Sequence, residues 1–150
     1  MDGPRVRTLG RMDAASIERA GEGGFPYLLH EGAAPVQAQW YFREETRLPV
    51  AVHRWVFPPG ATEGNHVHPH DEPLDELYLL VTGRATMTLG ERQVDMVAGD
   101  ALLAPAGVEH GVRNDGPEPA AFVVVWGRPG EGFDWTPYGT GRAAEQAATT

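Results

Sequence analysis

Cysteine and lysine are both missing from this 150-residue sequence, and all 12 basic residues are arginine. Without cysteine, the chain cannot form thiolate nucleophiles, iron–sulfur clusters or thiolate zinc sites. Without lysine, it cannot carry out Schiff-base catalysis or build the phosphate-binding loop that ends in lysine. These two absences narrow the possible chemistry before any motif is considered.

Long apolar runs and an excess of positive charge are also missing. No run of about 18 apolar residues exists, so no segment is expected to span a bilayer, and residues 1–5 lack the apolar core of a signal peptide. The net charge of −9 argues against binding to nucleic acids or to anionic membranes. We therefore expect a cytoplasmic protein whose partner is a small molecule.

The overall composition is typical of one turn-rich globular domain, with 19 glycines, 13 prolines and 41% hydrophobic residues. Short strands are predicted at 25–30, 36–43, 49–57, 64–68, 76–82, 85–89, 92–97, 101–104, 109–113 and 120–127. Many short strands separated by turn residues favour an all-β sandwich or barrel. We expect a barrel over 25–128, an N-terminal extension over 1–24 and a partly ordered tail over 129–150.

Alternation along the strands predicts which side chains enter the barrel. Arg54 is a poor interior residue, so His53, Trp55 and Phe57 are expected to face inward. These aromatic residues either enclose a substrate cavity or simply fill the barrel. The residues predicted to line such a pocket are Trp55, Phe57, Tyr78, Phe122 and Trp126.

Histidine is concentrated in the segment His66-Val67-His68-Pro69-His70. On a strand, residues i and i+2 point to the same face, roughly 6.6 Å apart along the chain, so His66 and His68 can reach one ion placed between them. Neutral imidazole is the commonest metal ligand among side chains. A third ligand has to come from elsewhere in the sequence, and His110 is the candidate.

Two stretches of the sequence resemble the two motifs of the cupin superfamily. The first runs from Gly60 through His66-x-His68 and Glu76 to Gly83. The second contains Gly99, Pro105, Gly107, His110 and Asn114 with the family spacing. The resemblance implies a cupin-type antiparallel β-sandwich or jelly-roll barrel in a single domain. It also implies one divalent transition metal held by the histidines at positions 66, 68 and 110.

The first motif departs from the family pattern at one place, because seven residues separate His68 from Glu76 where the family has three or four. The fourth ligand is therefore either Glu76, which keeps its spacing to Gly83, or His70, which would need the strand to bend at Pro69. Three histidines plus glutamate suit iron, manganese or nickel, whereas four histidines favour zinc or copper. Among these ions, we expect zinc.

The general character of the sequence is similar to that of cupin-type aromatic polyketide cyclases of actinobacterial biosynthetic pathways. That resemblance implies an aldol-type ring closure in an apolar cavity, with the metal as a Lewis acid. His53, Glu72 and Glu76 are the candidates for the base. The alternatives are a non-haem metal-dependent dioxygenase, another metal enzyme such as an isomerase, and a non-enzymatic binding module. A homodimer is expected through the outer sheet, with 40–42 as a candidate contact unless Trp40 and Phe42 face inward.

Overall fold

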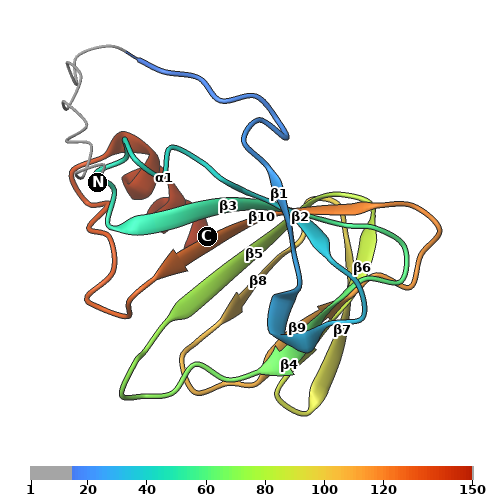
Figure 1. Cartoon of the computed structure of the whole chain (residues 1–150). Coiled ribbons are helices and arrows are strands. Elements are labelled where there is room, and N and C mark those ends of the chain that lie inside the picture. Colours follow the sequence, from blue (N-terminus) through green and yellow to red (C-terminus); the bar gives the residue numbers. More distant parts are fainter. Residues whose placement is uncertain (1–14, 150) are drawn as a thin grey trace.

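A computed structural model describes residues 15–149, and β-strands dominate it (Figure 1). The elements in chain order are β1 (Phe25–Tyr27), the 3-10 turn η1 (Leu29–Glu31), β2 (Val36–Trp40), β3 (Val50–Phe57), β4 (Thr62–His66), β5 (Asp75–Thr82), β6 (Arg84–Leu89), β7 (Arg92–Val97), β8 (Ala101–Ala104), β9 (His110–Arg113), β10 (Ala120–Gly127) and α1 (Gly139–Ala148). No helix within residues 15–149 has the length and apolar character needed to cross a membrane.

The strands form two antiparallel sheets. The larger has the order β1-β2-β3-β10-β5-β8, and the smaller has the order β4-β9-β6-β7. Strand β10 pairs with both β3 and β5, so Trp126 stands beside Ala51 on one side and Glu76 on the other. This mostly β, antiparallel architecture confirms the predicted cupin-type sandwich.

The core lies between the two sheets. The larger sheet contributes Phe57 and Phe122, and the smaller sheet contributes Met87 and Val112, all of them almost fully buried. His53, Trp55 and Phe57 are buried on alternate positions of β3, which confirms the inward face predicted from the sequence. The alternation of β3 and β10 therefore directs their aromatic side chains into the sandwich.

Each predicted strand overlaps an observed one, but three of them end early. The strand predicted over 25–30 stops at Tyr27 and the one over 36–43 stops at Trp40. The reason lies in the backbone just beyond, where His30 has φ 45° and Phe42 has φ 49°. A left-handed residue cannot continue an extended strand.

The third early end concerns the histidine motif. The strand predicted over 64–68 ends at His66, which places His68 in the loop that leads to β5. The backbone carbonyl of His68 accepts a hydrogen bond from the Gly107 N–H at 2.8 Å, so the loop is fastened to the second motif. The tail after β10 also contains a helix, α1, that the sequence analysis did not predict.

Two glycines have positions that only a residue without a side chain can occupy. Gly83 joins β5 to β6 with φ +84°, and an added Cβ would lie 2.5 Å from the Pro119 carbonyl oxygen. Gly64 lies in β4, where an added Cβ would be 1.9 Å from the His30 carbonyl oxygen. The second contact brings the turn η1 against the strand that carries His66.

Candidate metal centre

Four side chains from three strands and one loop meet inside the barrel. They are His66 at the end of β4, His68 in the following loop, Glu76 in β5 and His110 at the start of β9. One potential ligand atom from each lies within 4.8 Å of the others. The structure therefore brings together the three predicted histidines and selects Glu76 as their neighbour.

Backbone carbonyls orient two of these imidazoles. His66 Nδ1 lies 2.9 Å from the Gly64 carbonyl oxygen, and His110 Nδ1 lies 2.9 Å from the Val108 carbonyl oxygen. A carbonyl can only accept, so Nδ1 is the protonated nitrogen and Nε2 is the atom offered to the cluster. Fixing a ligating histidine through its other nitrogen is a common feature of metal sites.

Glu76 is the centre of the cluster. It is almost fully buried, and its carboxylate oxygens lie 3.0 Å from His68 Nε2 and 2.9 Å from His110 Nε2. The Tyr78 hydroxyl donates a hydrogen bond to the same carboxylate. Three groups therefore hold Glu76, which resolves the sequence-level choice between Glu76 and His70 in favour of Glu76 as the neighbour of the histidines.

A second buried carboxyl, that of Glu63 in β4, lies behind Tyr78. Its two oxygens are 3.1 and 3.3 Å from the Tyr78 hydroxyl. Burial and the nearby charge of Glu76 raise the pKa of Glu63 well above its ordinary value. One hydroxyl proton cannot serve two carboxylates, so the network is satisfied when Glu63 is the neutral acid that donates to the tyrosine oxygen.

The histidines of the cluster differ in how readily they accept a proton. Burial lowers the pKa of His66 to about 4, which keeps its Nε2 lone pair free. For His110, burial also opposes protonation, but the hydrogen bonds with Glu76 and the Val108 carbonyl and the charge of Glu76 together outweigh it, so the pKa is raised above the ordinary value. Burial opposes ionisation of Glu76, yet its hydrogen bonds with His110 and Tyr78 hold its pKa below the ordinary value.

Two candidates from the sequence lie outside the cluster. His70 is exposed, and its ring packs against Gly107, where an added Cβ would lie 2.6 Å from His70 Nε2. Glu72 is exposed as well. It lies in a turn in which its own backbone N–H donates a hydrogen bond to the Pro69 carbonyl oxygen at 3.2 Å. The longer gap between the motif residues therefore folds as an outward loop, which is why neither side chain joins the cluster.

Sequence reasoning missed two neighbours of the cluster. The His30 ring stacks on His66 with centroids 3.4 Å apart and planes 11° apart. Glu63 Oε1 lies 3.9 Å from His66 Nε2. Both contacts depend on the bulge in β4 and on the approach of η1. Spacing in the sequence carries no signal for either.

His53 is fully buried but lies outside the cluster of His66, His68, Glu76 and His110, among tryptophans. Its ring centroid lies 4.1 Å from those of Trp40 and Trp126 and 5.6 Å from that of Trp55. These residues line a cavity of about 530 Å³. The predicted pocket residues therefore divide, because Trp55 and Trp126 line this cavity whereas Phe57, Tyr78 and Phe122 are packed in the core.

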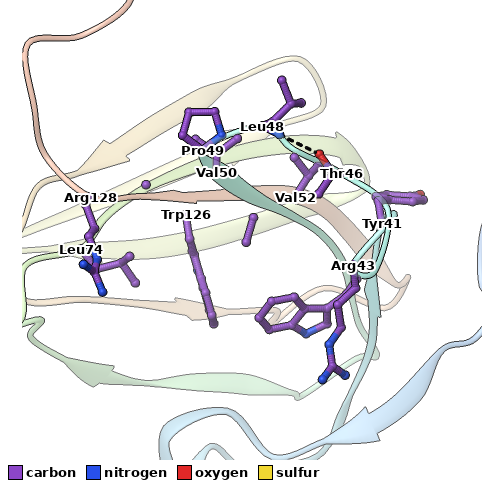
Figure 2. A pocket seen from close by; sticks show the side chains of 13 residues that line it. Tyr41, Arg43, Thr46, Leu48, Pro49, Val50, Val52, Leu74, Trp126 and Arg128 are labelled. Carbon is purple, nitrogen blue, oxygen red and sulfur yellow. Dashed lines mark hydrogen bonds between the residues drawn. The ribbon is translucent and has the colours of Figure 1, made fainter. Parts of the chain in front are cut away.

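A neighbouring cavity of about 570 Å³ shares Trp40, Arg43 and Trp126 with the first one. Figure 2 shows its side chains, with Trp126 between Arg128 on one side and Arg43 on the other. The two cavities together form an aromatic region with guanidinium groups at its edge. Trp40 thus faces this region, as the inward alternative predicted.

The fit of a metal ion can be judged from the side chains. His66 Nε2 is buried without a hydrogen-bond partner among the described residues, although it faces the cluster. An unpaired buried acceptor is costly, and a cation would satisfy it. Three imidazoles and one carboxylate are a donor set that transition metals accept.

The sequence matches a known domain family and is similar to that of a known protein. The family profile described as Cupin domain matches residues 53–126. The beta-alanine degradation protein BauB of Pseudomonas aeruginosa is 40% identical over 77 residues, which cover 49% of this chain and 77% of that protein.

Solved structures show the same fold. A protein of Thermotoga maritima, described as a predicted oxalate decarboxylase, superposes with a TM-score of 0.64 at 21% identity and covers 71% of this chain and 92% of its own. A Cupin 2 conserved barrel domain protein of Salinispora arenicola gives a TM-score of 0.59 at 24% identity, with 79% and 90% coverage. The similarity to BauB and the Cupin domain profile, taken with the two histidine motifs, show that the chain belongs to the cupin superfamily.

Proposed function

We propose that this cupin is a metal-dependent enzyme that acts on a small organic molecule, with one divalent transition metal held by His66, His68, His110 and Glu76. The observation that carries the proposal is the convergence of three imidazoles and one carboxylate within 4.8 Å of one another. When bound, such an ion polarises a carbonyl or a similar group of the substrate.

The residues around the cluster have positioning roles in this proposal. The Gly64 and Val108 carbonyls orient the two imidazoles, and the Tyr78 hydroxyl orients the Glu76 carboxylate. Glu63 holds a proton next to Tyr78, so the network keeps a single negative charge, on Glu76. The surrounding tryptophans line the neighbouring cavity with apolar surface, and excluding water from that space when a substrate binds would strengthen electrostatic interactions there.

The proposed identity of the ion depends on the fourth ligand. A set of four histidines would favour zinc or copper, but His70 lies outside the cluster. With Glu76 in its place, the donor set suits iron, manganese or nickel. We therefore propose these ions ahead of zinc.

Two reaction types fit this proposal, each supported by a different observation. A dioxygenase is supported by the carboxylate of Glu76, since that donor set suits redox-active ions. A cyclase that closes an aromatic polyketide ring by an aldol-type reaction is supported by the apolar, tryptophan-lined cavity beside the cluster.

Identifying the metal tests the proposal directly. Elemental analysis of the purified protein, before and after reconstitution, should find about one transition-metal ion per chain, and an X-ray absorption edge should identify it. Dioxygen consumption with catechol-type or diketone substrates would support the dioxygenase. Ring closure of a linear poly-β-ketone by the zinc-loaded protein without dioxygen would support the cyclase. Absence of stoichiometric metal in both preparations would contradict the metal site itself.

We also propose that two copies associate through the outer face of the larger sheet. Val52, Val125, Leu77 and Leu103 form a row across four adjacent strands of that sheet. Leu77 is 39% exposed and Leu103 is 55% exposed. A contiguous apolar face of this kind marks an association surface.

Sedimentation equilibrium tests the dimer, since Leu103→Asp should shift the protein to a monomer. The matched exposed substitution Val97→Asp, on β7 of the smaller sheet, should leave the oligomeric state unchanged. A monomeric wild-type protein at micromolar concentration would contradict the dimer. The cytoplasmic location stays a prediction from the sequence.

A further inference from the structure

The cavity around His53 has walls that favour a flat molecule. Its volume is about 530 Å³, within the usual range for small-molecule sites. Five of its nine lining residues are aromatic, namely Phe25, Tyr27, Trp40, Trp55 and Trp126. Trp126 meets Trp40 and Trp55 edge to face, at interplanar angles of 86° and 76°. Because these indole rings pack edge to face against one another, they present fixed faces and edges to a bound molecule.

Polar atoms at the deep end of this cavity lack partners. Both ring nitrogens of His53 and the Trp126 Nε1 are buried without a hydrogen-bond partner among residues 15–149. Burial lowers the pKa of His53 to about 4, so at neutral pH the imidazole offers one donor and one acceptor. The indole N–H adds a second donor. A hydroxyl group of a bound molecule would pair with one ring nitrogen of His53 and accept a hydrogen bond from the indole N–H.

Charge at the outer end of the cavity points to an anion. The chain contains 21 acidic residues, yet among residues 15–149 none lines this cavity or the neighbouring one. The charged residues that line them are Arg43 and Arg128, on either side of Trp126 in Figure 2. Arg43 lies over Trp40, 5.8 Å from the ring centroid. Its ion pair with Glu44 is exposed and contributes little, so the guanidinium is available.

We propose that this cavity binds a planar aromatic carboxylate, with the carboxylate at Arg43 and a hydroxyl or keto oxygen at His53 and Trp126. The inference rests on the proposed function, because it names the substrate class of that metal enzyme. Trp126 is the strand neighbour of Glu76, so the oxygen-bearing end of the molecule is the one nearest the metal cluster.

Titration calorimetry on the metal-free protein tests this site independently of the metal. The probes are 6-hydroxy-2-naphthoate, the uncharged 6-hydroxy-2-naphthamide, and 2-naphthoate, which lacks the hydroxyl. We expect the hydroxynaphthoate to bind about tenfold more tightly than either analogue, since each analogue loses one hydrogen-bonded or charged contact. Stripping the metal prevents a carboxylate from binding to the ion instead.

Variants then assign each end of the molecule. Arg43→Gln should remove the preference for carboxylate over amide, and His53→Phe should remove the preference for the hydroxyl. Arg47→Gln is the matched control for the first change, because Arg47 lines neither cavity. Thermal unfolding checks that the His53 variant is folded, and His53→Gln retains a polar group if it is not.

Several outcomes would overturn the site. No heat of binding at 1 mM probe, equal affinity for all three probes, or unchanged preferences in both variants would each do so. A preference for carboxylate seen only after metal loading would place that group on the ion and contradict the role of Arg43. Such a result would leave the proposed metal enzyme intact, whereas loss of the metal site would leave this cavity untouched. Concentration-dependent dimerisation blocked by the Arg43 variant would identify a second copy of the chain as the occupant instead.

Discussion

The interior of the barrel has a polar end and an aromatic end, and a buried histidine has opposite pKa shifts at the two ends. At the polar end, both ring nitrogens of His110 have partners, and its pKa is raised. At the aromatic end, neither nitrogen of His53 has a partner among the described residues, and its pKa falls to about 4. Burial alone therefore does not determine how readily a histidine accepts a proton. What distinguishes the two is whether an acceptor fixes the ring and a carboxylate faces it.

The strongest test of this contrast concerns stability. Trp55→Ala removes a large side chain that is 2% exposed at the aromatic end and should lower the free energy of unfolding by about 3–5 kcal/mol. Metal affinity should change little. Urea denaturation measures the loss, and Trp135→Ala, at a position 54% exposed, should change stability by no more than about 0.5 kcal/mol. Equal losses in the two variants would mean that the aromatic end is not a packed structure.

At the polar end, we expect a substitution to change metal affinity rather than mainly the free energy of unfolding. His110→Ala should weaken metal binding by more than about 100-fold, because losing a ligand costs more than losing a group that only orients one. His70→Ala, outside the cluster, is the matched control and should bind metal like the wild type. Competition with a chromophoric chelator measures both affinities. If His70→Ala weakened metal binding as much as His110→Ala does, His70 would have to be a ligand.

A smaller effect is expected from the residue that orients Glu76. Tyr78→Phe keeps the ring but removes the hydroxyl between Glu76 and Glu63, and it should lower metal affinity by about tenfold. Tyr41→Phe, at a half-buried tyrosine outside this network, is the control. Should Tyr78→Phe bind metal as tightly as the wild type, Glu76 would be held by the histidines alone.

The smallest effect concerns pH and His53. Its folded pKa of about 4 lies below the unfolded value of 6.5, so the unfolded chain binds the proton first as pH falls. The stability contribution is present in full well above pH 6.5 and is lost as pH falls through 6.5 toward 4. Between pH 7 and 6, the loss is about 0.7 kcal/mol for this group. The metal-free His53→Phe protein should therefore show a shallower decline in urea midpoint, and an unchanged slope would contradict the shifted pKa.

Much of this architecture could be predicted from sequence because it depends on local pattern. Alternation placed Trp55 and Phe57 inside, and motif spacing placed His66, His68 and His110 together. Turn residues such as Gly83 marked the strand ends. These signals are short-range, so one sequence suffices to detect them.

The remaining features depend on contacts between distant segments. Glu63 joins the polar network through Tyr78, and His30 reaches His66 from 36 positions earlier along the chain. Neither contact has a periodicity or a fixed spacing. The choice between Glu76 and His70 was open for the same reason, since it depends on the path of a loop. The helix α1 was missed because its glycine- and alanine-rich sequence lacks an apolar face directed to the core.

The stack of His30 on His66 has a consequence for the rate of metal exchange. The His30 ring covers one face of the His66 imidazole, and Gly64 lets the His30 backbone lie directly against β4. An ion that leaves the cluster along that side must first displace the ring and its turn. We therefore expect the lifetime of the bound ion to be set by the opening of the segment around η1, so that His30→Ala would hasten its release far more than it would weaken equilibrium binding.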